Sequence, residues 1–432
     1  MSKELGSDTT GIRFGPLGLA PGVGKGNLFT FLFAAFAGVA LTSFVSVIMP
    51  YILNVNVGLP LEEQGTVAGD LVFYGELVLI SMSGVFGAWS DQYGRRAVLI
   101  GGLLVVSAGY VALGMAGSVS ELIVVRVFIT FGIGAVSVML STIQVDYPSE
   151  DSRGKLAAIS GMCIGLGAVM IGIVFTRFPD MFANAGYEPL EASRLTMLTM
   201  TGFCIITALV ARLGLVGGAP KQVSGKPGLK TLVAAGLAAG RMNPRILLSY
   251  GAGFVGRADL VVVGTFYSLW LTQAGIEAGL GADVAAKNAG AMFALVMTSA
   301  LVWAPILGWL NDRYDRTAIM ALSLLLAFAG YCLMGLFGDP QGEWLYPASI
   351  LLGIGQISVT QACATLMGQE SPPETRGSVV GTFSVCGAAG ILFVTSVGGR
   401  LYDGIGPEAP FILIGVLNGL LALFAIWLWR RQ

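Results

Sequence analysis

The segment at residues 87–96 reads Gly-Ala-Trp-Ser-Asp-Gln-Tyr-Gly-Arg-Arg, and a second stretch of the chain repeats its pattern. Residues 308–316 read Gly-Trp-Leu-Asn-Asp-Arg-Tyr-Asp-Arg, which places Asp312 at an offset of 221 from Asp91. Self-similarity at a fixed offset indicates a structural unit that is used more than once. The two segments therefore predict a chain of two related halves.

Two further markers recur in the same order. Gly-Ile-Gly-Ala-Val-Ser-Val at residues 132–138 returns as Gly-Ile-Gly-Gln-Ile-Ser-Val at 353–359, again at an offset of 221. The Arg-Gly pair at 153–154 returns at 376–377, an offset of 223. Three ordered markers at nearly one offset predict an internal duplication, which is the architecture of many secondary transporters.

Composition places these halves in a membrane. Residues of the apolar set AVILMFWYC make up 55% of the chain, charged residues make up 11%, and the mean hydropathy is +0.79. A soluble domain contains about 25% charged residues, and a membrane-spanning helix needs about 20 apolar residues. Twelve segments satisfy that length, at residues 28–54, 67–88, 97–116, 121–144, 156–178, 195–216, 246–273, 289–309, 318–337, 345–367, 378–398 and 410–429.

The twelve segments divide into two bundles of six. We expect an N-terminal segment at 1–27 without a signal peptide, bundles at 28–216 and 246–429, a basic linker at 217–245, and a tail at 430–432. The linker carries five basic residues and no acid, and its stretch TLVAAGLAAGRM predicts a short helix on the inner membrane surface.

Basic side chains set the expected orientation, because cytoplasmic loops retain Lys and Arg. With the N-terminus inside, 18 of the 24 Lys and Arg residues fall on the inner side. The outer side receives only four, at Arg177, Arg194, Lys287 and Arg400. We therefore expect both termini in the cytoplasm and a multi-pass protein of the prokaryotic inner membrane.

Composition also excludes several functions. A net charge of −1 gives no electrostatic footprint for nucleic acid, and the absence of His removes the commonest acid–base and metal-ligand side chain. The five Cys lie in apolar segments without CxxC spacing, and the chain contains neither a Walker A sequence nor a nucleophile elbow. We expect no enzyme activity, no cofactor and no metal site.

The loop motif resembles that of the major facilitator superfamily. The family pattern Gly-x-x-x-Asp-x-x-Gly-Arg-Arg is complete at Gly87, Asp91, Gly94, Arg95 and Arg96. The second copy keeps Gly308, Asp312 and Arg316 but has Asp315 in place of the later glycine, and the loops at 146–154 and 370–377 resemble the family's acid-Pro-Arg-Gly segments. The resemblance covers essentially the whole chain and implies a transporter of two six-helix bundles that works by alternating access, functional as a monomer.

The resemblance also implies a charge network at the cytoplasmic rim. Its ion pairs would lock the halves together when the transporter opens outward and break when it opens inward; alternatively, the charges only fix topology and helix ends. The predicted members are Gly87, Asp91, Gly94, Arg95, Arg96, Asp146, Glu150, Arg153, Asp312, Arg316, Glu370, Glu374 and Arg376.

Few charges lie inside the predicted bilayer: Glu76, Arg126, Arg257 and Asp259. Each costs roughly 2.5–3.5 kcal/mol near the membrane centre on insertion scales. Arg257 and Asp259 are two positions apart, about 200° around a helix, so they face opposite sides. In the superfamily, helices 1, 4, 7 and 10 line the central cavity, which would put Arg126 and one of the helix 7 charges on its wall. The alternative is a buried salt bridge that only fixes packing.

Without His, proton coupling must use a carboxylate, and Asp259 followed by Glu76 are the candidates. Gln356 and Gln361 of helix 10 add hydrogen-bonding groups, and Tyr267 of helix 7 adds an amphipathic wall, although ordinary packing explains them as well. We expect a proton-coupled carrier of a small anionic or amphipathic organic solute. Alternatives are a multidrug exporter and a non-transporting assembly factor or sensor. The loop motif favours the exporter, whereas the altered helix 4 and helix 5 patterns, with Thr130 in place of the expected Gly, oppose it.

Overall fold

The computed structural model describes residues 13–14, 17–218, 229–340, 342–371 and 376–431. The described residues contain twelve helical spans that are long and apolar enough to cross a membrane. The predicted all-α architecture with twelve transmembrane helices is confirmed.

The first half begins with two short antiparallel strands, β1 (Arg13–Phe14) and β2 (Leu17–Gly18). Its helices are α1 (Lys25–Val47), α2 (Met49–Ile52), α3 (Gln64–Tyr93), α4 (Arg95–Met115), α5 (Val119–Asp146), α6 (Arg153–Ile173), α7 (Phe178–Asn184) and α8 (Pro189–Gly214).

The second half follows helix α9 (Leu229–Met242), which corresponds to the short helix predicted in the linker. Its helices are α10 (Pro244–Val261), α11 (Ser268–Glu277), α12 (Ala282–Arg313), α13 (Arg316–Phe337), α14 (Leu345–Glu370), α15 (Arg376–Gly404) and α16 (Ala409–Trp429). Helix α9 packs along α15 and accepts a hydrogen bond from Tyr250 Oη at the Gly236 carbonyl, at 2.8 Å.

The first membrane span differs from its prediction. The continuous helix expected over 28–54 ends at Val47 and gives way to α2 and then to a π-helical turn at Leu53–Val57. Pro50 accounts for the interruption because it has no backbone N–H to donate to the preceding turn. The corresponding span of the second half also changes to a π-helical turn, at Val262–Tyr267 between α10 and α11.

The two copies of the loop motif begin their following helices differently. Gly94 has φ +91°, in the left-handed region that favours glycine, directly before α4. In the second copy Asp315 has a negative φ, and its carboxylate accepts a hydrogen bond from the Ala318 amide at 2.9 Å. The aspartate that breaks the family pattern therefore caps the N-terminus of α13.

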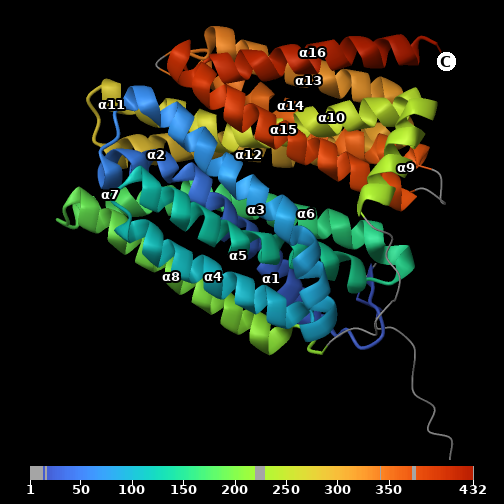
Figure 1. Ribbon diagram of the computed structural model, residues 1–432, viewed down its shortest axis with the longest axis horizontal. Coiled ribbons are helices and arrows are strands. Elements are labelled where there is room, and N and C mark those ends of the chain that lie inside the picture. The colour runs from blue at the N-terminus through green and yellow to red at the C-terminus, as the bar shows by residue number, and fades with distance from the viewer. Residues whose placement is uncertain (1–12, 15–16, 219–228, 341, 372–375, 432) are drawn as a thin grey trace, which may run out of the picture.

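Among the described residues, a single apolar core cluster contains residues of both halves. We call the end that holds residues 87–96 the motif end, and the opposite end, where α3 begins at Gln64, the far end. One core cluster includes Leu71 of the first half and Phe266 of the second, whereas the motif end has separate clusters around Val98 and around Val379. Figure 1 shows the two bundles together near α2 and α11 and diverging toward α9.

Both described ends of the chain lie at the motif end. Leu19 forms an isolated antiparallel bridge with Pro148, two residues after α5, and the Ala20 amide donates to the Tyr147 carbonyl at 2.9 Å. The C-terminus lies at the same end as α9 (Figure 1). An even number of membrane spans returns the chain to the side on which it started, so both described ends lie at the same end of the molecule.

Candidate functional site

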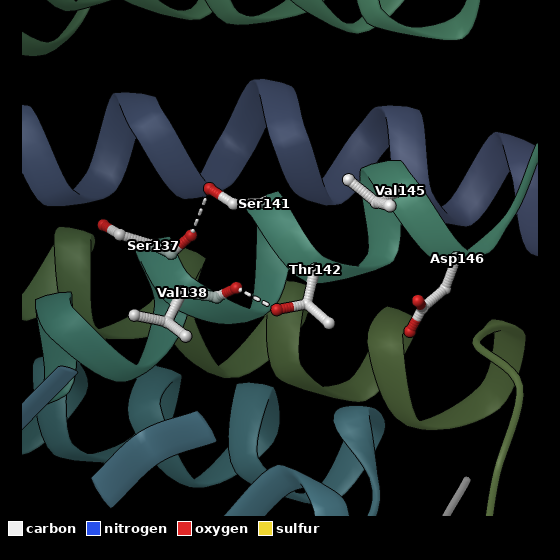
Figure 2. Close-up of a pocket in the computed structure, with 6 residues that line it drawn as sticks. All are labelled: Ser137, Val138, Ser141, Thr142, Val145 and Asp146. Atoms are coloured by element: carbon white, nitrogen blue, oxygen red, sulfur yellow. Dashed lines mark hydrogen bonds between the residues drawn. The ribbon is translucent and has the colours of Figure 1, made fainter. Parts of the chain in front are cut away.

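One face of α5 carries a polar stripe beside a cavity. The cavity has a volume of about 490 Å³ and is lined by Ser137, Val138, Ser141, Thr142, Val145 and Asp146. Ser141 and Thr142 donate their hydroxyl protons to carbonyls one turn earlier, at 2.9 and 2.8 Å (Figure 2). Their oxygen lone pairs remain available as acceptors.

Arg126 lies on the same stripe, closer to the far end. It precedes Ser137 by 11 residues, which is about three helical turns, or about 16 Å along α5. Arg126 is only 8% exposed, and its Nη2 donates to Ser46 Oγ of α1 at 3.2 Å. Among the described residues, Arg126 forms no ion pair with an acid.

Two buried polar atoms here, one of Arg126 itself and one of Thr130, lack hydrogen-bond partners among the described residues. Within the described part of the chain, neither Arg126 Nε nor Thr130 Oγ1 makes a hydrogen bond. Gly75 of α3 packs closely against both atoms, since an added Cβ would lie 3.5 Å from Nε and only 3.0 Å from Thr130 Oγ1. A buried cation with an unused donor and a neighbouring hydroxyl is a feature that an anionic group can satisfy.

Glu76 and Arg257 are oppositely charged side chains of the two halves that attract each other without forming an ion pair among the described residues. Glu76 of α3 is half-buried, and Arg257 of α10 is exposed and acts on Glu76 as an attractive neighbouring charge. The Arg257 side chain passes close to α15, because a Cβ added to Gly387 would lie 2.7 Å from its Cγ. The pair therefore lies where α3, α10 and α15 approach one another.

Asp259 faces the opposite side of α10 from Arg257, as the helical period predicts. It is 0% exposed, and its Oδ1 accepts a hydrogen bond from Asn418 Nδ2 of α16 at 3.3 Å. The Tyr331 hydroxyl of α13 donates to the Asp259 carbonyl at 3.0 Å. Asp259 Oδ2 and Asn418 Oδ1 have no hydrogen-bond partner among the described residues. Asp259 is thus turned toward α13 and α16 and does not meet Arg257.

The other predicted site residues of the second half are mostly buried. Tyr267 is fully buried, shares a 2.7 Å hydrogen bond with Ser349 Oγ and packs edge-on against Phe411. Gln356 is buried, and Gln361 is half-buried with no partner for its Oε1 among the described residues. Among the described residues, none of the three forms a hydrogen bond with Arg126, whose partner is Ser46.

We expect Asp259→Asn to raise the apparent unfolding temperature. The amide removes a buried charge and supplies a donor next to the unpartnered Asn418 Oδ1, a gain of about 1–3 kcal/mol. Thermal unfolding of the detergent-purified protein measures the effect, and Asn418→Asp, which places two acids together, is expected to lower the temperature. A lower unfolding temperature for Asp259→Asn contradicts this account. Loss of proton-driven accumulation in a stable Asp259→Asn protein would instead support the predicted coupling role.

The family model of the Major Facilitator Superfamily matches residues 31–283 and 258–432, which is nearly the entire chain. The chain belongs to this superfamily. Its members are transporters of small solutes, often with protons, so the protein is a non-enzymatic transporter by family.

Several known proteins are similar to this one over most of the chain. Magnetosome protein MamH of Paramagnetospirillum magneticum is 27% identical over 413 residues, which are 93% of this chain and 92% of MamH. Magnetosome protein MamZ of the same organism is 29% identical over 88% of this chain, but the match spans only 59% of MamZ. The crystal structure of nucleoside transporter NupG shares the fold, with a TM-score of 0.72, 15% identity, and coverage of 93% of this chain and 98% of NupG.

The superfamily loop motif forms a compact charge cluster in the first half. Arg95 Nη1 donates to Asp91 at 2.6 Å, and Arg95 Nε donates to Asp146 of α5 at 3.1 Å. Arg96 donates instead to two backbone carbonyls at the end of α8, both at 3.2 Å. Glu150 and Arg153 form a longer, exposed pair at 3.6 Å. The structure thus brings together Asp91, Arg95 and Asp146 as the sequence suggested.

The second half pairs differently. Glu370 of α14 accepts hydrogen bonds from Arg245 and Asn243, both at 3.0 Å. In the part of the chain that the structure describes, neither Asp312 nor Arg316 forms an ion pair with Glu370. The exposed Arg376 begins α15, and Glu374 lies outside the described residues. The motif-end ion pairs described above, Arg95 with Asp91 and Asp146, Arg153 with Glu150, and Arg245 with Glu370, each join residues of the same half.

We expect Asp91→Asn to reduce transport several-fold with little change in the unfolding temperature. The Asp91–Arg95 pair is partly exposed and contributes at most about 1 kcal/mol to stability, but it positions Arg95 against Asp146. Initial uptake rates in proteoliposomes, normalised to folded protein, measure the effect. Glu62→Gln is the matched control because it neutralises an exposed carboxylate outside the motif network. Equal transport by wild type and Asp91→Asn would leave the motif charges with a topological role only.

Proposed function

We propose that the protein is a secondary active transporter that moves a small organic anion across a prokaryotic membrane by alternating access. The observation that carries this proposal is Arg126, a buried cation without an acidic partner among the described residues. Isolated charges within a membrane are costly and are retained for function. An anionic substrate group supplies the missing countercharge.

The α5 stripe supports a specific mode of recognition. A guanidinium presents parallel donors that fit a carboxylate or phosphate oxygen pair. The Arg126 Nε and Thr130 hydroxyl can complete that contact, and Ser137 and Ser141 can hydrogen-bond a polar part of the solute nearer the motif end. Val138 and Val145 on the same cavity wall add apolar contact, which suits an amphipathic anion.

Glu76 and Arg257 form the proposed coupling device. When Glu76 is ionised, the Arg257 charge is held by α3 of the other half; when Glu76 takes up a proton, Arg257 is released to interact with substrate. A proton then biases the two-state equilibrium through this difference in interaction energy. Glu76 is preferred to Asp259 for this role because it shares an environment with a cation across the two halves.

The proposal also includes the orientation of the protein in the membrane and its conformational state. The excess of Lys and Arg at the motif end favours a cytoplasmic location for that end. The halves join at the far end and separate toward the motif end, so the conformation would be inward-open (Figure 1). Because two relatives are named magnetosome proteins, fluorescence localisation should include internal bacterial membranes as well as the cytoplasmic membrane.

A thermal-shift screen of the purified protein tests the substrate class. A ligand that binds only the folded protein raises the unfolding temperature by mass action. We expect small organic carboxylates or phosphates to stabilise the wild-type protein and to lose that effect in Arg126→Gln. Stabilisation by cationic or neutral lipophilic drugs alone would overturn the anion proposal and favour multidrug export. No response to any class, together with no exchange of solute, would favour a non-transporting role.

A further inference from the structure

At the far end, a carboxylate of one half caps a helix of the other. Asp403, in the last turn of α15, accepts hydrogen bonds from the backbone amides of Gly65 at 2.8 Å and Thr66 at 2.7 Å. These amides belong to the first turn of α3, where helical N–H groups have no acceptor within their own helix. In the described chain, Glu63 at the start of α3 provides no side-chain cap of its own.

The two helices meet without space for side chains. A Cβ on Gly65 would lie 2.4 Å from Asp403 Oδ1 and 2.5 Å from the Tyr402 ring. A Cβ on Gly399 would lie 2.6 Å from the Gly65 carbonyl oxygen. Glycine at both positions therefore permits the close approach that places Asp403 over the end of α3.

A second buried contact reinforces the first. Gln273 of α11 donates to the Leu61 carbonyl at 2.9 Å and to Gln64 Oε1 at 3.3 Å, and it accepts from the Tyr402 hydroxyl at 2.5 Å. Gln273 is 6% exposed and Tyr402 is 3% exposed. The Gln273 amide is satisfied across the interface only while the far end is closed, since separation of the halves would remove its Leu61 and Gln64 partners. The Tyr402 hydroxyl bond lies within the second half and orients Gln273 toward them.

We propose that Asp403 is the latch that holds the far end closed, through its cap on α3, with Gln273 and Tyr402 completing the lock. The inference rests on the proposed alternating-access function, because opening this end would uncap α3. Asp403 makes charge-assisted hydrogen bonds at a helix N-terminus, where negative charge is favourable. The neighbouring Arg400–Asp70 pair, at 3.2 Å, is 57% and 31% exposed, so it contributes little.

Hydrogen exchange of the full-length protein in nanodiscs tests the latch. In Asp403→Asn, amides of residues 61–70 are expected to exchange about tenfold faster than in wild type, as loss of a charge-assisted hydrogen bond implies. Amides of residues 86–96 are expected to exchange more slowly, because opening one end closes the other. Asp70→Asn, which removes the exposed pair, should change exchange at 61–70 by less than about twofold. Unchanged exchange at 61–70 in Asp403→Asn would overturn the proposal.

Gly65→Ala provides a second route to the same state without altering charge. Its methyl group collides with Asp403 and Tyr402, so the same local increase at 61–70 and decrease at 86–96 are expected. Gly84→Ala on the same helix is the matched control, since an added Cβ there meets nothing within 4 Å. A uniform increase in exchange throughout both latch variants would indicate general destabilisation and contradict the latch. The readout needs no substrate, so a failure to transport anions leaves it interpretable.

Discussion

Replacing Arg126 with glutamine is expected to lower the rate of anion transport by at least about a hundredfold. Removing one member of a buried charge pair typically costs 2–5 kcal/mol, of which about 2.7 corresponds to that factor. In the unliganded protein, Arg126 has only the Ser46 hydroxyl as a hydrogen-bond partner among the described residues, so its replacement disrupts little else. Uptake of the anion identified by thermal shift, measured in proteoliposomes of matched protein content, quantifies the loss.

Two neighbouring variants separate charge from packing. Arg126→Lys keeps the charge but loses the parallel donors, and we expect it to retain a fraction of the activity. Ser46→Ala removes only the 3.2 Å hydrogen bond to Arg126 and is expected to change uptake by less than about tenfold. If Arg126→Gln transports the anion at the wild-type rate while remaining folded, Arg126 does not recognise substrate.

Neutralising Glu76 is expected to abolish accumulation against a concentration gradient while preserving passive exchange. Glu76→Gln resembles the protonated side chain permanently, so binding of a proton can no longer change its interaction with Arg257. The carrier would still change between its two conformations with substrate bound, but a proton gradient would no longer drive net transport. Accumulation under an imposed pH difference and exchange without one, measured on the same vesicles, distinguish the two activities.

The matched control for Glu76 is Glu62→Gln. Glu62 is an exposed glutamate in the turn before α3, and its neutralisation is expected to leave both activities unchanged. Arg257→Gln combined with Glu76→Gln tests the pairing itself, because residues that interact directly give non-additive effects. Gradient-driven accumulation that persists in Glu76→Gln would exclude this carboxylate as the coupling group.

The sequence predicted what depends on local composition and on repeated motifs. The twelve apolar segments of the sequence correspond to twelve membrane-spanning helical segments in the structure, because each is long enough to cross a bilayer. The loop motif also indicated the charged residues that gather at the motif end, where Arg95 contacts Asp91 and Asp146. The helical period also placed Arg257 and Asp259 on opposite sides of α10.

The sequence could not predict which neighbour each helix face would meet. Asp259 contacts Asn418, and Arg257 acts on Glu76, through tertiary packing between distant segments that no motif marks. Tyr267 became part of the core for the same reason. Asp403 was missed because it lies 337 positions from Thr66 and its partners are backbone amides, which leave no signature in a sequence.

Counterflow in proteoliposomes tests the central claim most directly. Vesicles loaded with a high concentration of the unlabelled anion and diluted into labelled anion report exchange without any need for an energy source. The account predicts a transient accumulation of label in wild-type vesicles, its absence in Arg126→Gln vesicles, and its persistence in Glu76→Gln vesicles. Equal accumulation in wild-type and Arg126→Gln vesicles, or none in wild-type vesicles with any organic anion that binds, would contradict it.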